Sequence, residues 1–392
     1  MGRGGEPAGD HGHEQGEVRA GVEAAVLRAG GVARNPARLT LATGCPKHMV
    51  FGPCGGVREG GGCEVAEHAC VFLDGGPSWS ADAVAPIDRA AVPRSFPRSS
   101  SLLDAADRGP VVLTDLTVRP FDPASVRAVT RILADSCDAV LIGEHSNRPD
   151  LPPTLLAGEV RAAGGVPWVT LTCRDRNRVG LETELGGLAA LAADRGADGV
   201  LCVTGDARAA QVRAGGVRVG GVRDGVPQVF DLDGPRLAAL AADSGMPVAV
   251  PEAPEAPPVQ HRATRLLLKQ RAGAALAVLN HVSSPARVAT FVGEARRVGL
   301  SIPVIASVAV YTDERSARVL QSFPGLRLDP AEVAQVLAAP DPRSAGIAAA
   351  LAEARALLAI DGVVGVNLSG LASAAGLLTA AEVKAEIGQS LR

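Results

Sequence analysis

Two apolar stretches of the chain run directly into charged residues, and the first of them ends in a row of arginines. Trp168–Cys173 is followed by Arg174, Arg176 and Arg178 at alternate positions. If the backbone stayed extended, these side chains would point the same way, and guanidinium groups suit phosphate or carboxylate ligands. We expect one of the three to face a ligand. The alternative is that they hold the loop by pairing with nearby carboxylates, namely Asp175, Glu182 and Glu184.

The second stretch ends in Gly205-Asp206, a pair that suits recognition of a heterocycle. Glycine lets a bound ring approach the backbone closely, and the carboxylate can accept hydrogen bonds from ring N–H groups. Another carboxylate, Asp115, follows the apolar run that begins at Val111. Between apolar walls such a group can act as a general acid. From the residues alone we favour the alternative, in which Asp115 caps a helix or pairs with Arg119.

Four of the seven cysteines lie close together in the sequence, at Cys45, Cys54, Cys63 and Cys70. Flanking glycines free the backbone to bend, so that four thiolates can converge. Such a site suits structural zinc, and the same ligands could hold an iron–sulfur cluster. Because paired C-x-x-C motifs are absent, four ordinary buried thiols are an equal alternative on spacing alone.

The composition excludes several kinds of partner. A net charge of -3 provides no basic surface for nucleic acid or for an anionic membrane. No stretch is apolar enough to span a membrane, and the first residues lack the apolar core of a signal peptide. We therefore expect a cytoplasmic protein with reduced thiols.

The elements that must position these residues repeat regularly after residue 100. Apolar runs alternate with stretches in which Ala and Leu recur at helical spacing. Aromatic residues make up 3% of the chain, and a core of Ala, Val and Leu fits short parallel strands covered by helices. The apolar runs are Val111–Val118, Ala139–His145, Trp168–Cys173, Gly199–Asp206, Pro247–Glu252, Ala275–His281, Pro303–Val310 and Gly362–Ser369.

Helices are expected between these strands, near 125–135, 153–164, 184–195, 234–244, 261–272, 285–298, 313–322 and 373–390, with a helical insertion between Leu328 and Ile360. Eight strand–helix units predict a (β/α)8 TIM barrel rather than a doubly wound sheet. Active sites of such barrels lie at the C-terminal ends of the strands. The polar residues at these ends are Asp115, Glu144, His145, Arg174, Asp206, Glu252, Asn280 and Asn367.

The pattern divides the chain into four segments. Residues 1–16 are expected to form a disordered tail, 17–76 a small cysteine-rich and metal-binding domain, 77–100 a linker, and 101–392 the barrel. Glu17–Ala29 has the spacing of an amphipathic helix. The long connection Ala207–Phe230 is either a mobile lid or a tolerated surface loop. It is followed by Asp231 and Asp233, either of which can cap the next helix.

The strand-end motifs resemble those of methylenetetrahydrofolate reductase. The resemblance rests on Thr170–Arg178 and on Val203-Thr204-Gly205-Asp206, and it continues in Val250-Pro251-Glu252 and in Lys269 with Ala272-Gly273-Ala274. It covers about residues 100–392. Separately, the segment around Gly52-Pro53-Cys54-Gly55-Gly56 resembles the cysteine-rich C-terminal domain of that family, which favours metal binding.

The resemblance implies a flavin-dependent barrel that reduces 5,10-methylenetetrahydrofolate to 5-methyltetrahydrofolate with NADH or NADPH. It implies that Asp115 is the acid and that Asp206 and Asn280 bind folate. The FAD-binding residues would be Thr170, Arg174, Gly205, Glu252 and Lys269. In that chemistry an acid opens the imidazolidine ring to an iminium, and a hydride from the flavin completes the reduction.

Several positions differ from the family pattern, among them Asn280–Ser284 and Ala306–Val308. Two further hypotheses follow. The barrel could bind folate without hydride transfer, as a regulatory or partner subunit, or it could be a tetrahydrofolate-linked methyltransferase with metal on the cysteines. A homo-oligomer or a complex with a partner reductase subunit is compatible with each.

Overall fold

The computed structural model describes residues 1–2, 44–73, 99–144, 149–191, 196–206, 228–322, 326–370 and 373–392. Thr43–Arg392 form one compact unit. The tail, the helix expected at Glu17–Ala29, most of the linker and residues 207–227 of the expected lid lie outside the described residues.

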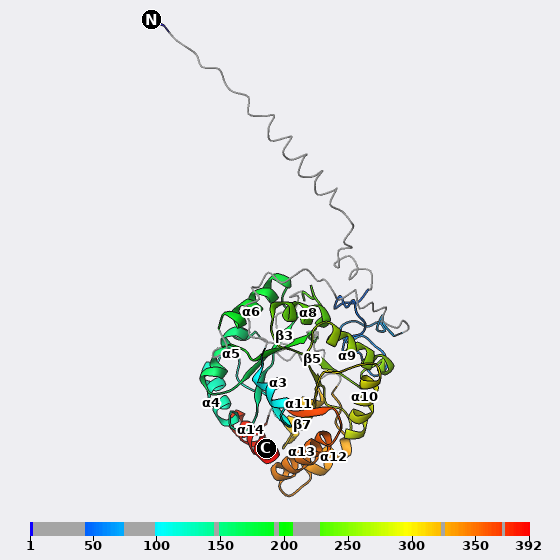
Figure 1. Cartoon of the computed structure of the whole chain (residues 1–392). Helices are drawn as coiled ribbons and strands as arrows, with labels where there is room; N and C mark the ends of the chain where they lie inside the picture. Colours follow the sequence, from blue (N-terminus) through cyan, green and yellow to red (C-terminus); the bar gives the residue numbers. More distant parts are fainter. Residues whose placement is uncertain are drawn as a thin grey trace. The chain divides into compact units, whose positions relative to one another are not determined.

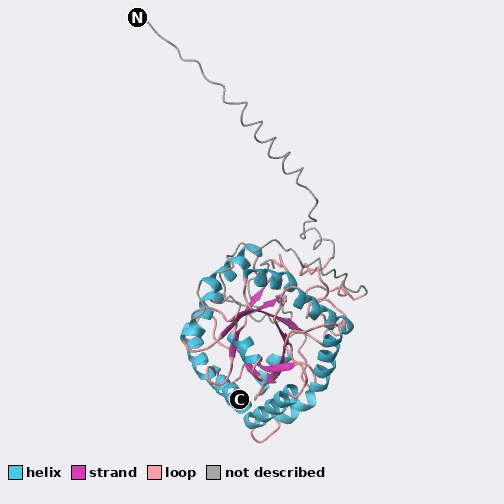
Figure 2. Ribbon diagram, viewed as in Figure 1, coloured by secondary structure: helices cyan, strands magenta, loops and turns pink. Residues whose placement is uncertain are grey.

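Eight parallel strands close into a barrel in sequence order, which confirms the predicted (β/α)8 fold. Figures 1 and 2 show the strands arranged as a ring inside the helices. The strands are β1 (Val111–Asp115), β2 (Ala139–Ile142), β3 (Pro167–Thr172), β4 (Gly199–Val203), β5 (Val248–Glu252), β6 (Leu276–Leu279), β7 (Val304–Val310) and β8 (Val363–Gly370).

Helices surround the barrel on the outside (Figure 2). They are α4 (Pro123–Leu133), α5 (Pro153–Ala162), α6 (Arg178–Ala190), α8 (Gly234–Ser244), α9 (Arg262–Arg271), α10 (Pro285–Arg297), α11 (Glu314–Gln321), α12 (Pro330–Leu337), α13 (Pro342–Leu358) and α14 (Leu377–Leu391). The expected insertion before β8 is helical and consists of α12 and α13. No helix in the described ranges is long and apolar enough to cross a membrane.

Residues of each strand alternate between two apolar clusters. In β1, Val111 and Leu113 pack inside the barrel with Trp168 and Leu276, whereas Val112 packs outward against the helices. Because both faces of each strand are buried, the strands read as continuous apolar runs.

A short helix, α3 (Ser101–Ala106), lies against the starts of the strands, and the sequence did not reveal it. Leu102 joins the inner cluster. Asp198, just before β4, accepts hydrogen bonds from Ser100, Ser101 and Leu102 and from Trp168. Burial alone raises the pKa of Asp198, but the hydrogen bonds outweigh it and lower the pKa.

Several predicted boundaries were wrong. β2, β4 and β6 end before the polar residues that the prediction included in them, and β1 ends at Asp115 rather than at Val118. α6 begins at Arg178 rather than near residue 184. Its first turn forms early because Asp231 accepts a hydrogen bond from the Arg178 amide and Asn177 accepts one from the Gly180 amide.

Candidate functional site

A cavity of about 590 Å³ lies at the C-terminal ends of the strands, a size that suits a small-molecule ligand. The inward-facing positions that build it change from apolar to polar along each strand. Leu141, Leu201 and Val278 line the cavity from the inner cluster. Further along the strands, Asp115 and Ser307 also line it.

Eight residues predicted from separate strand ends and from α9 line this one cavity. They are Asp115, Thr170, Arg174, Gly205, Asp206, Glu252, Lys269 and Asn280. The closed barrel explains their convergence, because all strands of a parallel barrel end at one rim. Their individual roles in binding or catalysis stay predictions.

Asp115 neither caps a helix nor pairs with Arg119, so the interpretation that we favoured from the residues alone was wrong. Asp122 caps α4, and its carboxylate lies 3.8 Å from Arg119. Asp115 Oδ1 accepts a hydrogen bond of 3.0 Å from Asn367 Nδ2. Beneath it, Lys384 Nζ donates to the Asp115 main-chain carbonyl at 2.8 Å. Burial lowers the pKa of Lys384 to about 8.

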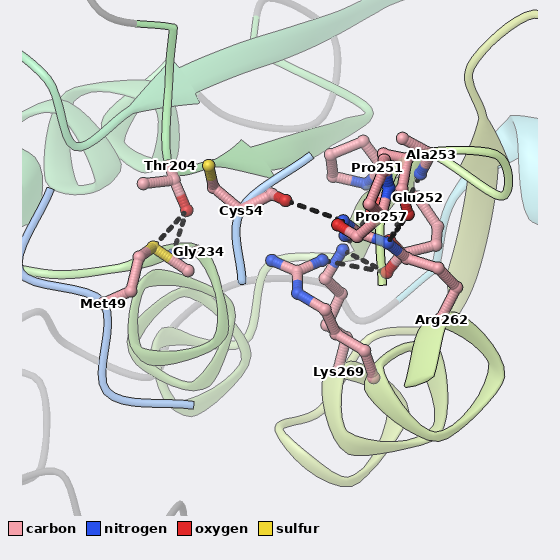
Figure 3. Close-up of polar contacts among 12 residues, drawn as sticks. Met49, Cys54, Thr204, Gly234, Pro251, Glu252, Ala253, Pro257, Arg262 and Lys269 are labelled. Carbon is pink, nitrogen blue, oxygen red and sulfur yellow. Dashed lines mark hydrogen bonds and ion pairs between the residues drawn. The ribbon is translucent and has the colours of Figure 1, made fainter. Parts of the chain in front are cut away.

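Glu252, at the end of β5, is enclosed by three cations from α9 (Figure 3). Its carboxylate lies 3.4 Å from Arg262 and 2.9 Å from each of Arg265 and Lys269. Burial alone raises the pKa of Glu252, but the cations outweigh it and lower the pKa. Burial lowers the pKa of Lys269 to about 7. Three buried cations facing one carboxylate leave an excess of positive charge beside the cavity.

The row of arginines expected after β3 does not form, because the helix begins at Arg178. Instead each arginine has an acidic partner. Arg174 lies 2.9 Å from Asp175, and Arg178 lies 3.0 Å from Glu182. Arg176 pairs with Glu144. Of the three, Arg174 lines the cavity, and it also donates to the Asp206 carbonyl at 3.3 Å.

Gly205 and Asp206 form a tight corner on the rim. Gly205 has φ +92°, and an added Cβ would lie 3.1 Å from the Cβ atoms of Thr172 and Arg174. Only glycine fits both restrictions without strain. Burial and the nearby Glu64 raise the pKa of Asp206, against the opposing effects of Lys47 and Arg174.

The cysteine segment, defined here as residues 44–73, packs on the same rim and forms part of the cavity wall. Lys47 Nζ donates to the Gly205 carbonyl at 2.9 Å and to Glu64 at 2.6 Å. The Cys54 carbonyl accepts a hydrogen bond of 3.0 Å from Arg262 (Figure 3). The segment's cavity-lining residues are Lys47, Cys54, Gly55 and Gly56.

Two further contacts place the cysteine segment above β4. Met49 is fully buried, and Thr204 Oγ1 lies 3.6 Å from its sulfur (Figure 3). The Val50 amide donates to Asp233, whose side chain also caps α8 as predicted. The sequence signal for this docking was the apolar run Met49-Val50-Phe51 between two cysteines, which we did not interpret.

The four cysteines of the segment surround a second, much smaller cavity of about 20 Å³, which His68 also lines. Burial raises the pKa of Cys45 and of Cys70. Among the described residues, no group of three or more His, Cys, Asp or Glu side chains is arranged so that it could hold a metal ion. The thiols are thus gathered without being arranged as ligands, and metal binding stays a prediction.

His281, which follows β6, also lines the large cavity but was not among the predicted site residues. Its Nε2 lies 2.8 Å from a Glu353 oxygen, and Nδ1 lies 2.5 Å from the Arg327 carbonyl. Because both neighbours accept hydrogen bonds, the doubly protonated ring fits best. Burial lowers the pKa of His281, but these two contacts outweigh it and raise the pKa.

Comparison with known families supports the resemblance of the cysteine segment. The family model described as "Methylene-tetrahydrofolate reductase C terminal" matches residues 33–75. No curated protein sequence matches the chain.

Several solved structures are similar to the chain. One, an uncharacterized protein from Clostridium thermocellum that binds two copies of 5-methyl-5,6,7,8-tetrahydrofolic acid, has a TM-score of 0.54 at 9% identity, and the match covers 74% of this chain and 99% of that one. A 2,3-dimethylmalate lyase has a TM-score of 0.39 at 11% identity, covering 69% and 80%. Tryptophan synthase from M. tuberculosis has a TM-score of 0.41 at 16% identity, and the match covers 74% of this chain and 98% of that one. The likeness to the Clostridium thermocellum structure agrees with the (β/α)8 fold of the chain. The matched segment 33–75 is similar to the C-terminal domain of methylenetetrahydrofolate reductase.

Proposed function

We propose that the cavity at the barrel mouth binds a tetrahydrofolate and that the protein reduces 5,10-methylenetetrahydrofolate to 5-methyltetrahydrofolate. The observation that carries this proposal is the convergence of eight motif-derived residues on one cavity of about 590 Å³. The folate-binding neighbour from Clostridium thermocellum, whose fold the chain shares, supports the choice of ligand.

The charges around the cavity fit a ligand with a polar ring system and an anionic end. Asp115 and Asn280 supply polar groups for a pterin. Arg265 and Lys269, which belong to the group with excess positive charge, suit a carboxylate or phosphate. Arg265 Nε has no hydrogen-bond partner among the described residues, so an anion there would satisfy a buried donor.

The same cationic group fits the diphosphate of FAD, which with NADH or NADPH is the reductant that the family resemblance implies. Bound flavin would supply a hydride. Arg265 and Lys269 would hold its phosphates, and Gly205 would let a ring approach the rim.

In this reaction Asp115 has the role of proton donor. Its carboxyl group would protonate the imidazolidine nitrogen whose bond to the bridging carbon breaks, leaving an iminium for reduction. Asn367 fixes the orientation of the carboxyl group, and the apolar floor formed by Leu141, Leu201 and Val278 limits the access of water.

The proposal is tested by spectroscopy, calorimetry and turnover on the full chain. We expect a flavin absorbance in the isolated protein, or after FAD is added, and NADH or NADPH oxidation that depends on methylenetetrahydrofolate. Asp115→Asn should lower kcat by about a hundredfold or more without loss of folate binding. Asp104→Asn, an exposed carboxylate on α3, is the matched control.

Two outcomes would change the proposal. Calorimetric binding of 5-methyltetrahydrofolate without turnover under any of these conditions would leave a folate-binding protein and exclude the reductase. Absence of folate binding at millimolar ligand would exclude both.

A further inference from the structure

Asn367, in the middle of β8, lies between Asp115 and Ser307 at the cavity. Its Nδ2 donates to Asp115 Oδ1 at 3.0 Å and lies 3.5 Å from Ser307 Oγ. Its residue surface is 4% exposed, and it lines the large cavity. The fold holds it there from both sides, because its backbone pairs with Leu113 of β1 and with Ser307 of β7.

The amide oxygen of Asn367 is a buried acceptor without a hydrogen-bond partner in the described part of the chain. Amide nitrogen and oxygen are assigned from their neighbours. Asp115 Oδ1 accepts the bond from Nδ2, and it can do so while Oδ2 carries the proton that the proposed reaction needs, so the Asn367 oxygen is left with no donor among the described residues. An unsatisfied buried acceptor costs about 1–3 kcal/mol, so a water or a ligand in the cavity that donates to it would be stabilised there.

We propose that Asn367 Oδ1 accepts a hydrogen bond from an N–H group of the ligand while Nδ2 holds Asp115 in position. This inference rests on the proposed folate function and adds a binding residue and an orientation to it. The side of the cavity formed by β1, β7 and β8 then receives the N–H-rich pterin head.

The chemistry of the two ends of a tetrahydrofolate supports this orientation. The pterin head carries ring N–H groups and an exocyclic amine, which can donate to an amide oxygen. The glutamate tail carries carboxylates, which accept hydrogen bonds rather than donate them and so cannot satisfy the Asn367 oxygen. The side of the cavity beside Asp115 and Asn367 is therefore left to the pterin head rather than to the tail.

Fragments of the ligand provide the test. The probes are 5-methyltetrahydrofolate, 6-methyltetrahydropterin for the head, and p-aminobenzoylglutamate for the tail, each titrated into the full chain by calorimetry. Asn367→Leu preserves side-chain size but removes the amide. We expect it to weaken binding of the whole ligand and of the head fragment by about tenfold each and to leave the tail fragment unchanged.

Controls separate binding from folding. Asp104→Asn changes an exposed side chain on α3 that does not line the cavity, so it should change head binding less than threefold. If Asn367→Leu does not fold, as judged by its melting temperature, Asn367→Ala removes the amide without adding bulk and replaces it. A general structural defect would weaken head and tail together.

Three results would overturn the inference. They are unchanged head binding in the Asn367 variants, weaker tail binding alone, or equal weakening of both fragments. If the unmodified protein binds none of the three probes, the proposed folate function fails, and the inference fails with it. If the unmodified protein binds 5-methyltetrahydrofolate and the Asn367 variants bind it equally well, only the proposed role of Asn367 is excluded.

Discussion

Lys47 donates a hydrogen bond of 2.9 Å to the main-chain carbonyl of Gly205, which lies 158 residues further along the chain. The contact joins the cysteine segment to the corner at the end of β4, where Asp206 lines the cavity. Lys47 is almost completely buried, and its second partner is the Glu64 carboxylate. The cysteine segment therefore contributes to the cavity wall through a buried charged residue.

Replacement of Lys47 by methionine should loosen the cysteine segment and weaken ligand binding. Glu64 loses its cationic partner in a buried setting, which costs on the order of 3 kcal/mol. We expect faster proteolysis within residues 44–73 and at least tenfold weaker binding of 5-methyltetrahydrofolate. Arg58→Met, an exposed cation on the same segment, is the control. Unchanged affinity in Lys47→Met would show that the wall is dispensable for binding.

Cys54→Ser should lower the metal content of the protein if the four cysteines of the segment bind zinc or an iron–sulfur cluster. Cys54 lines both cavities, so loss of the thiol should also disturb the ligand site. Metal is measured by plasma emission, and a band near 400 nm distinguishes a cluster from zinc. Cys137→Ser, in the core near β2, should leave the metal content unchanged. Equal metal in wild type and Cys54→Ser would remove Cys54 from the ligand set.

The affinity for an anionic ligand should depend on pH through Lys269. Its pKa is lowered to about 7, and a bound anion favours the charged form and raises the pKa. Binding is therefore strongest below pH 7 and weakens as the pH rises through 7, by at most about tenfold per pH unit. Lys269→Arg keeps a permanent cation and should make the dissociation constant independent of pH in this range. A pH dependence that survives in Lys269→Arg would assign the titration to another group.

Asp198 should stabilise the barrel above its titration range and lose that effect in acid. Its pKa is lowered in the folded state, so the stabilisation is present above the unfolded pKa, about 4, and is lost as the pH falls through the lower folded value. Asp198→Ala should lower the free energy of unfolding by about 3 kcal/mol near pH 7, because it leaves buried donors without a partner. The exposed Asp104→Asn should cost less than 0.5 kcal/mol. Denaturant titrations at pH 7 and pH 3 measure both, and an equal effect at the two pH values would contradict the assignment.

The barrel fold and several of the residues that line its cavity could be predicted, because both follow from local sequence patterns. A strand buried on both faces is a continuous apolar run, and its first polar residue marks the C-terminal rim. That rule brought Asp115, Asp206 and Asn280 to one cavity before any contact was known. The rule does not specify where a strand stops, which is why β1 was extended beyond Asp115.

Contacts between distant residues could not be predicted in this way. The pairing of Asp115 with Asn367 spans the closure of the barrel between β1 and β8, and it displaced the local pairing with Arg119. The first turn of α6 depends on Asp231, which no pattern around Arg178 reveals. The hydrogen bond from Lys47 to the Gly205 carbonyl likewise depends on how the cysteine segment fits the end of β4, which neither local sequence reveals.

Gly56 offers almost no space for a side chain at the point where the cysteine segment meets the rim. A Cβ atom there would lie 1.7 Å from Glu64 Oε2, so a single added methyl group would force Glu64 away from Lys47. Gly56 is thus a position where even a small substitution acts on a neighbouring charged side chain. A Gly56→Ala variant would disturb the buried Lys47–Glu64 pair while every residue that lines the cavity except Gly56 stayed unchanged.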